Sequence, residues 1–259
     1  ETKRDQDIAA KQIQIQELQI AKQSLQNYFL ILGIIFLIII VVLIYLQHRK
    51  SEKLISNMLP KSIADRLKTD DKKIADRFES ASVIFIDIVN FTELHSFDKP
   101  DLPIKPEEIV NLLNKLYTEF DKLAEKFGLE KIKTIGDCYM VAAGVPIVRN
   151  DHAKIALEFA IEAMKINRYN ISFRCGIDCG PVIAGVIGEK KFIYDLWGDT
   201  VNTASRMEEY GERGKIHVTE RFKNEIDKME FGSNLPITDR GLIEIKGKGM
   251  MRTFLIDII

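Results

Sequence analysis

The most pronounced hydrophobic pattern in the chain is a run of nineteen uncharged residues from Tyr28 to Leu46. As a helix, this run would rise about 29 Å, which is close to the hydrocarbon thickness of a bilayer. A buried core helix rarely holds so long an apolar stretch, and a cleaved signal peptide would have a shorter one after a basic region. The pattern therefore predicts a transmembrane helix at 28–46.

Basic residues are unevenly distributed around this run. Arg49, Lys50 and Lys53 follow it closely, whereas only Lys22 lies just before it. Positive charge near a membrane helix marks its cytoplasmic end. We therefore expect a single-pass membrane protein in the lipid bilayer, with its C-terminal part in the cytoplasm.

Two shorter segments flank the predicted span. Residues 1–27 carry apolar positions from Ile8 onward that favour an extracytoplasmic helix or short coiled coil. Because the chain begins at Glu1 rather than Met, we expect a fragment or a processed form, and an upstream sensor domain is one possibility. Residues 47–79 form a cytoplasmic connector with helical spacing that Pro60 should break into two amphipathic pieces. A plain linker is the alternative.

From Ser80 to Ile259, predicted strands and helices alternate in one domain. The Gly136-Asp137 pair predicts a hairpin turn, and Gly180-Pro181 predicts a second turn between strands. The order βαββαβ is that of an α+β, ferredoxin-like sheet with helices on one face. The predicted elements are strand 81–89, helix 105–127, strands 129–135 and 138–143, a helix from 150 or 151 to 168, strands 171–179 and 182–187, and a helix at 200–210.

Composition excludes several classes of protein. The 259 residues carry 37 Lys and Arg against 38 Asp and Glu, so a nucleic-acid binder driven by positive charge is not expected. An apolar content of 46% supports a sizeable core. The three cysteines, Cys138, Cys175 and Cys179, lack the spacing of a disulfide scaffold or a zinc site, and we expect them to pack as small apolar side chains in a reducing compartment.

Two acidic residues are candidates for metal binding. Asp87 lies within an entirely apolar strand pattern, where a carboxylate needs a partner or a cation. Asp137 lies in the predicted hairpin turn and alone would be an ordinary turn residue. In a βαββ arrangement the hairpin adjoins the end of the first strand, so the two carboxylates can converge. Such a pair suits Mg²⁺ or Mn²⁺ bound to phosphates.

Four ordered motifs resemble the class III adenylyl and guanylyl cyclases. They are FIDIVNFT at 85–92, KTIGDCYM at 133–140, YDLWGDTVNTASRME at 194–208 and IKGKGMMRTFLI at 245–256. The resemblance implies that Asp87 and Asp137 bind two divalent metal ions, Mg²⁺ or Mn²⁺, between the catalytic domains of a dimer.

The resemblance also assigns substrate contacts. Asn202 would orient the ribose of ATP and Arg206 would stabilise charge on the transferring phosphoryl group; their spacing of four places them on one helix face. The backbone of Phe91 and Thr92 would line the triphosphate. Lys246 would contact the terminal phosphates, and Lys248 is the second choice for this contact. Without the motifs, each polar residue would be an ordinary surface side chain.

The base can be argued from hydrogen-bond polarity. Adenine presents an acceptor at N1 and a donor at its amine, and Lys133 and Asp195 would supply the matching donor and acceptor. Guanine reverses this polarity and would leave both side chains mispaired. Guanylyl members typically hold Glu and Cys at these positions, so the pair favours ATP.

The expected activity is thus conversion of ATP to 3′,5′-cyclic AMP and pyrophosphate, by two-metal-assisted attack of the ribose 3′-hydroxyl on the α-phosphate. In this family one subunit holds the metals and the other supplies Asn and Arg, so a homodimer would complete two sites. Regulation through the membrane helix is a further expectation. The alternatives are a guanylyl cyclase, a non-catalytic nucleotide-binding dimer, a diguanylate cyclase, which would show a GGDEF-type turn, and a structural membrane anchor. His95 and His152 are expected in capping or surface roles.

Overall fold

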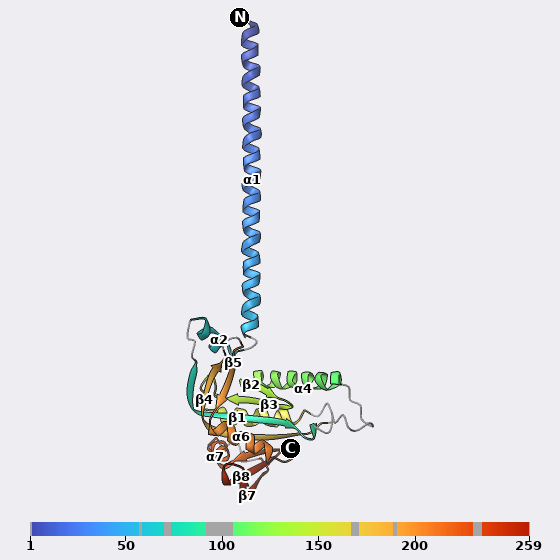
Figure 1. The fold of residues 1–259 in the computed structure, drawn as a ribbon, viewed down its shortest axis with the longest axis vertical. Coiled ribbons are helices and arrows are strands. Elements are labelled where there is room, and N and C mark those ends of the chain that lie inside the picture. The colour runs from blue at the N-terminus through green and yellow to red at the C-terminus, as the bar shows by residue number, and fades with distance from the viewer. Residues whose placement is uncertain are drawn as a thin grey trace. The chain divides into compact units, whose positions relative to one another are not determined.

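The computed structural model describes residues 2–56, 59–69, 74–91, 106–166, 171–188, 191–229 and 235–258. The chain divides into two compact units, Glu1–Asn57 and Met58–Ile259 (Figure 1).

The first unit is a single long helix, α1 (Thr2–Ser56). It contains both the helix expected from Ile8 onward and the apolar run 28–46. The large apolar side chains of that run are 40% to 66% exposed within the chain. By length and composition this helix could cross a membrane. So large an apolar surface needs lipid or another helix to cover it.

The second unit begins with a short helix, α2 (Lys61–Lys68), directly after Pro60. The carbonyl of Pro60 accepts hydrogen bonds from the backbone N–H groups of Ile63 and Ala64 at 3.0 and 2.9 Å. Both of these residues are buried in one cluster with strand residues of the second unit. Pro60 therefore starts a new helix, as predicted, and that helix packs on the sheet.

The βαββαβ order is confirmed. It consists of β1 (Ala75–Ile88), α4 (Pro106–Phe127), β2 (Glu130–Ile135), β3 (Cys138–Ala143), α5 (His152–Met164) and β4 (Phe173–Ile187). The remaining elements are β5 (Ile193–Trp197), α6 (Asp199–Glu209), β6 (Lys215–Thr219), α7 (Glu220–Lys228), β7 (Ile237–Ile245) and β8 (Gly249–Asp257).

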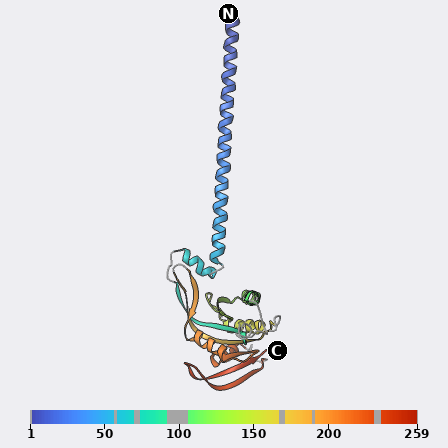
Figure 2. The same cartoon turned by 45° about the vertical axis from the view of Figure 1, so that its right-hand side comes forward.

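These strands form one mixed sheet in the order β2-β3-β1-β4-β6-β8-β7, with β5 paired to β4. In Figures 1 and 2 the red β7–β8 hairpin forms the edge of the sheet opposite β2. β1 and β4 are central strands, and the predicted metal site lies on this part of the sheet.

The alternating side chains of β1 enter two separate cores. Ile84 and Ile86 pack in a cluster with residues of α4, α5 and α7 on one face of the sheet. Val83 and Phe85 pack in a second cluster with residues of α2, β5 and α6 on the other face. The α+β class is confirmed, and α6 covers the face opposite α4 and α5.

Three element boundaries differ from the prediction. β1 starts at Ala75, six residues early, because its polar residues pair with β4 beyond the buried part of the sheet. α5 ends at Met164 rather than near residue 168. β4 runs unbroken through Gly180-Pro181, where a turn was predicted.

The chain passes Gly180 with a φ of 150°, opposite a register shift in β1 between Phe78 and Ala81. A bulge at this point allows the strand to continue past a proline, which cannot donate to the ladder. The Gly-Pro turn signal was therefore overridden by pairing with β1.

Candidate active site

Asp87 lies near the end of β1 with its side chain 13% exposed. Arg174 on β4 is its direct cross-strand partner. The Arg174 guanidinium donates to Asp87 Oδ2 at 2.8 Å. The isolated carboxylate in the apolar strand therefore has the charged partner that its burial requires.

Asp137 lies in the two-residue turn between β2 and β3, where Gly136 has a φ of 63°. The structure brings Asp137 close to Asp87, as expected from the βαββ order. Burial and the nearby charge of Asp137 raise the pKa of Asp87, and Arg174 opposes this rise. Two neighbouring carboxylates repel each other until a cation is shared between them.

This pair fits a divalent cation that also binds phosphate. Among the residues that the structure describes, no group of three or more His, Cys, Asp and Glu side chains could hold a metal ion. Mg²⁺ is commonly held by one or two carboxylates, with substrate oxygens and water completing its shell. Asp87 and Asp137 therefore match a metal that is bound together with a nucleotide.

The segment after Asp87 is described only in part. β1 ends at Ile88, and Asn90 adopts a left-handed conformation with a φ of 60° as the chain turns. Phe91 packs against the core on the α4 side. Thr92 lies outside the described residues.

Lys133 and Asp195 meet although 62 positions separate them. Lys133 Nζ donates to Asp195 Oδ2 at 2.5 Å, and the side chains are 36% and 16% exposed. Lys133 lies beside a register shift of β2, and Asp195 is the middle residue of β5. The structure thus places the expected donor and acceptor side by side.

Asn202 and Arg206 both lie on α6. Asn202 is exposed, and Arg206 is partly exposed and ion-paired with Glu209 one turn further on. β5 leads directly into α6, so Asp195 and both of these residues come from one continuous segment of the chain.

The two candidate phosphate lysines differ in their contacts. Lys246 is exposed in the turn between β7 and β8, and its backbone N–H donates to Tyr210 Oη at 3.3 Å. Lys248 instead forms an ion pair with Asp199 at the start of α6, and its side chain is only 16% exposed. The Lys246 side chain is therefore the more accessible of the two.

Sequence reasoning missed Arg174 and Glu208. Arg174 Nε donates to Glu208 Oε1 at 2.5 Å while the same guanidinium contacts Asp87. Burial raises the pKa of Glu208 to about 7, and Arg174 opposes this rise. The sequence does place Arg174 between Phe173 and Cys175 in an apolar strand, which is an unusual position for a charged side chain. Its partners, Asp87 and Glu208, become evident only in the folded sheet.

Helix α6 lies unusually close to β4 at Gly176. A Cβ atom on Gly176 would lie 1.9 Å from the backbone nitrogen of Glu208 and 2.6 Å from the carbonyl oxygen of Ala204. Only glycine permits this approach. The position of α6, and of every side chain on it, is therefore set by direct contact with the strand that carries Arg174.

Exposed apolar side chains flank Asp195 on the sheet. Asp195 shares a strand face with Ile193 and Trp197, which pair with Ile187 and Ile183 of β4. These four side chains are 36% to 58% exposed. We call them the β4–β5 apolar face, and an apolar face of this kind is typical of a protein–protein interface.

The cysteines and one histidine have structural roles. Cys175 and Cys179 are buried in the core, as expected, and Cys138 is partly buried; all three are free thiols. His152 is 3% exposed and both of its ring nitrogens are hydrogen-bonded, to Ser80 Oγ and Ser82 Oγ, so the capping or surface role expected for it is wrong. His95 lies outside the described residues.

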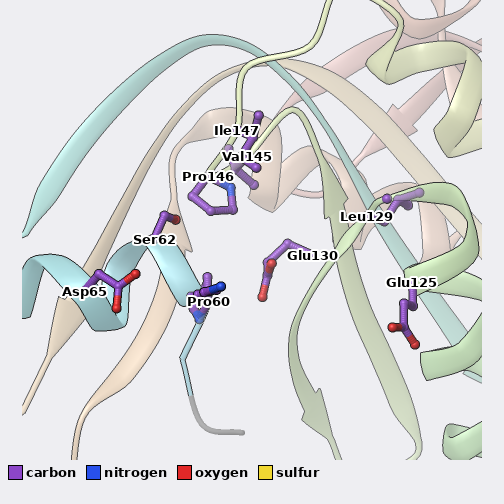
Figure 3. A pocket seen from close by; sticks show the side chains of 11 residues that line it. Pro60, Ser62, Asp65, Glu125, Leu129, Glu130, Val145, Pro146 and Ile147 are labelled. Carbon is purple, nitrogen blue, oxygen red and sulfur yellow. The ribbon is translucent and has the colours of Figure 1, made fainter. Parts of the chain in front are cut away.

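A separate cavity of about 580 Å³ lies between α2 and the start of β2 (Figure 3). None of the predicted site residues that the structure describes lines it. Glu130 points into it beside Pro60, and burial raises the pKa of this carboxyl to about 7. The cavity is thus distinct from the candidate active site.

Comparisons with known proteins show the family of this chain. The "Adenylate and Guanylate cyclase catalytic domain" family matches residues 74–258. An adenylate cyclase of Mycobacterium tuberculosis is 44% identical over 218 residues, which are 81% of this chain and 47% of that protein. The human guanylate cyclase soluble subunit beta-2 is 38% identical over 220 residues, 82% of this chain and 34% of that protein.

A similar solved structure is the catalytic core of a rhodopsin-guanylyl cyclase with converted specificity in complex with ATPαS. It has a TM-score of 0.64 and 36% identity, and the match covers 71% of this chain and 98% of that one. The chain therefore belongs to the adenylate and guanylate cyclase catalytic domain family, the class III cyclases. It spans about half the length of the mycobacterial relatives that it matches.

Proposed function

We propose that this protein is an adenylyl cyclase that converts ATP to 3′,5′-cyclic AMP and pyrophosphate at the interface of a homodimer. The observation that carries the choice of ATP is the 2.5 Å contact between Lys133 and Asp195. The family includes cyclases of both nucleotides, so the base-reading residues decide between them.

Lys133 and Asp195 form a donor beside an acceptor before any nucleotide binds. Lys133 would donate to adenine N1, and Asp195 would accept from the adenine amine. Guanine offers an acceptor at O6 and a donor at N1, which leaves the ammonium and the carboxylate mispaired. Each mispaired, partly buried polar group costs about 1–3 kcal/mol, which favours ATP over GTP.

Asp87 and Asp137 would hold two divalent cations, Mg²⁺ or Mn²⁺, together with the triphosphate. When bound, these cations supply positive charge at the ribose 3′-hydroxyl and at the departing pyrophosphate. Arg174 keeps Asp87 oriented and charge-compensated until then. The backbone at Phe91 and Thr92 would lie along the triphosphate.

The residues of α6 would act on the reacting groups. Asn202 would orient the ribose so that its 3′-hydroxyl faces the α-phosphorus. Arg206 would exchange its ion pair with Glu209 for a contact with the substrate, and would stabilise the charge that develops on the transferring phosphoryl group. Lys246 would contact the terminal phosphates. The protein thus contributes mainly position and charge.

The β4–β5 apolar face supports the homodimer. Asp195 lies between Ile193 and Trp197 on this face and contacts Lys133, so a nucleotide bound to the pair is next to the surface that a second copy would cover. We assign the two acidic residues of each active site to one subunit and Asn202 and Arg206 to its partner. Each dimer then has two equivalent sites.

The long apolar helix supports a membrane location. Residues 28–46 would span the bilayer, with 1–27 outside, the connector 47–79 and the catalytic domain 80–259 in the cytoplasm, and a sensor domain upstream. α2 packs on the catalytic unit, so movement of the connector would reach the sheet directly. This packing of α2 supports the proposal that the membrane helix regulates the catalytic domain.

A mixed dimer tests the shared site. One chain carries Asp87→Ala, and a second chain with a different tag carries Asn202→Ala and Arg206→Ala; both are co-expressed at full length and purified through both tags. With ATP and Mn²⁺, each variant alone should lose activity about 100-fold or more. The mixed dimer holds one intact site and should regain about half of the wild-type activity.

The matched control is Asp227→Ala, which removes an exposed carboxylate on α7 and should leave activity unchanged. A folded mixed dimer as inactive as its parents would contradict the shared site. An Asp87→Ala chain with wild-type activity would contradict the metal assignment.

A further inference from the structure

Glu208 is a buried carboxylate in the second half of α6, and the catalytic roles proposed above do not use it. Its side chain is 11% exposed and accepts from Arg174 Nε at 2.5 Å. Arg174 in turn donates to Asp87 at 2.8 Å. Three elements, α6, β4 and β1, are therefore joined by a continuous chain of charged contacts.

The chain of contacts affects how Asp87 meets a cation. The Arg174 guanidinium lies between two carboxylates, so its charge is shared between Glu208 and Asp87. Without the charge of Glu208, Asp87 would be the one remaining carboxylate that neutralises the Arg174 guanidinium. Arg174 would then compete more strongly with a metal ion for the Asp87 carboxylate. Glu208 therefore affects how readily Asp87 binds a cation in the half of the active site that its own subunit supplies.

The same residue lies on the helix that serves the other half-site. Asn202 and Arg206 precede Glu208 on α6, which contacts β4 directly at Gly176. Further contacts fix the end of this helix: His217 Nδ1 lies 2.7 Å from the carbonyl oxygen of Met207, and Arg240 donates to the carbonyl oxygen of Tyr210 at 2.8 Å. α6 is therefore held against β4 and at its C-terminal end.

We propose that Glu208 is a positioning residue that acts on both active sites of the dimer. Through Arg174, Glu208 controls the charge and orientation of the metal-binding Asp87 of its own subunit. Through α6, it positions the Asn202 and Arg206 that the same subunit contributes to the second active site. This inference rests on the proposed function. It adds that the two sites are linked through one carboxylate in each subunit.

Mixed dimers with a single intact site separate the two actions. One chain carries Asp87→Ala and Asp137→Ala, the other carries Asn202→Ala and Arg206→Ala. Glu208→Gln, which keeps the size and an acceptor oxygen, is then added to one chain or the other. The Mn²⁺ concentration at half-maximal activity and the kcat at saturating Mn²⁺ and ATP are measured for each full-length dimer.

On the chain with intact Asp87, Glu208→Gln should raise the half-maximal Mn²⁺ concentration about tenfold, because Arg174 then competes for Asp87. On the chain with intact Asn202 and Arg206, it should lower kcat about tenfold at saturating Mn²⁺, because α6 is less well held. A purely structural role would not produce this split.

The control is Asp227→Asn, which changes an exposed carboxylate on α7 and should change neither value. If Glu208→Gln prevents folding, Glu208→Asp keeps the charge and should give smaller effects in the same two directions. If Glu208→Gln changes activity on only one of the two chains, or on neither, the link between the sites is overturned. If the mixed dimer without Glu208→Gln is inactive, the shared site itself is wrong and the link falls with it.

Discussion

The contact between Gly176 and α6 yields a quantitative prediction. In Gly176→Ala, the new Cβ would lie 1.9 Å from the backbone nitrogen of Glu208, whereas ordinary contacts begin at 3.4 Å. The helix backbone must therefore retreat by about 1.5 Å, the difference between these distances. Overpacking of this kind typically costs about 1–3 kcal/mol of unfolding free energy.

The expected loss of activity is larger than the loss of stability suggests. A displacement of about 1 Å in catalytic groups can lower the rate about 100-fold, and α6 carries both Asn202 and Arg206. We expect Gly176→Ala to remain a folded dimer with kcat lowered about 100-fold. Urea unfolding, size-exclusion chromatography and cyclic-nucleotide production measure the three quantities.

The matched control is Gly214→Ala. Gly214 has open space around its Cβ position but a φ of 74°, so alanine there costs about 1–2 kcal/mol without displacing α6. The control should lose similar stability and keep its activity. Equal kcat values in the two variants would refute the claim that close packing on β4 positions the catalytic residues.

Three further predictions concern stability and assembly. Burial lowers the pKa of His217 to about 4, so as the pH falls the unfolded chain binds a proton at this histidine before the folded chain does. The free energy of unfolding should therefore fall by about 2 kcal/mol from pH 7 to pH 5. Urea titrations of His217→Asn should not show this loss. Glu130 has the opposite sign: burial raises its pKa to about 7, so its contribution to stability is present below pH 4.5 and is lost as the pH rises through about 7. Glu130→Gln should therefore stabilise the fold by about 3 kcal/mol at pH 8 and not at pH 4. Ile193→Asp should yield inactive monomers in size-exclusion chromatography, whereas Leu242→Asp, an exposed apolar position on β7, should remain an active dimer.

Local patterns predicted the parts of the site that depend on short stretches of chain. Asp87 was identified because a carboxylate inside an apolar strand needs a partner, and Asp137 because a hairpin turn adjoins that strand. Lys133 and Asp195 were paired through their motifs, and the structure places them 2.5 Å apart.

Other features depend on tertiary contacts that no local pattern contains. Glu208 is 34 positions from Arg174, and Arg174 is 87 from Asp87, so their linkage follows only from the sheet order and the close approach of α6. Similarly, Gly180-Pro181 has a turn signal that strand pairing overrides. His152 was expected near the surface because nothing in its neighbourhood indicated that Ser80 and Ser82 would enclose it.

The measurement that tests the central claim most directly is product identification with equal concentrations of ATP and GTP. The full-length dimer is supplied with Mn²⁺ in detergent, and both cyclic nucleotides are quantified by mass spectrometry. If Lys133 and Asp195 read the base, cyclic AMP should exceed cyclic GMP by about tenfold or more. Cyclic GMP in equal or greater amount, or no cyclic nucleotide from a folded dimer, would contradict the account.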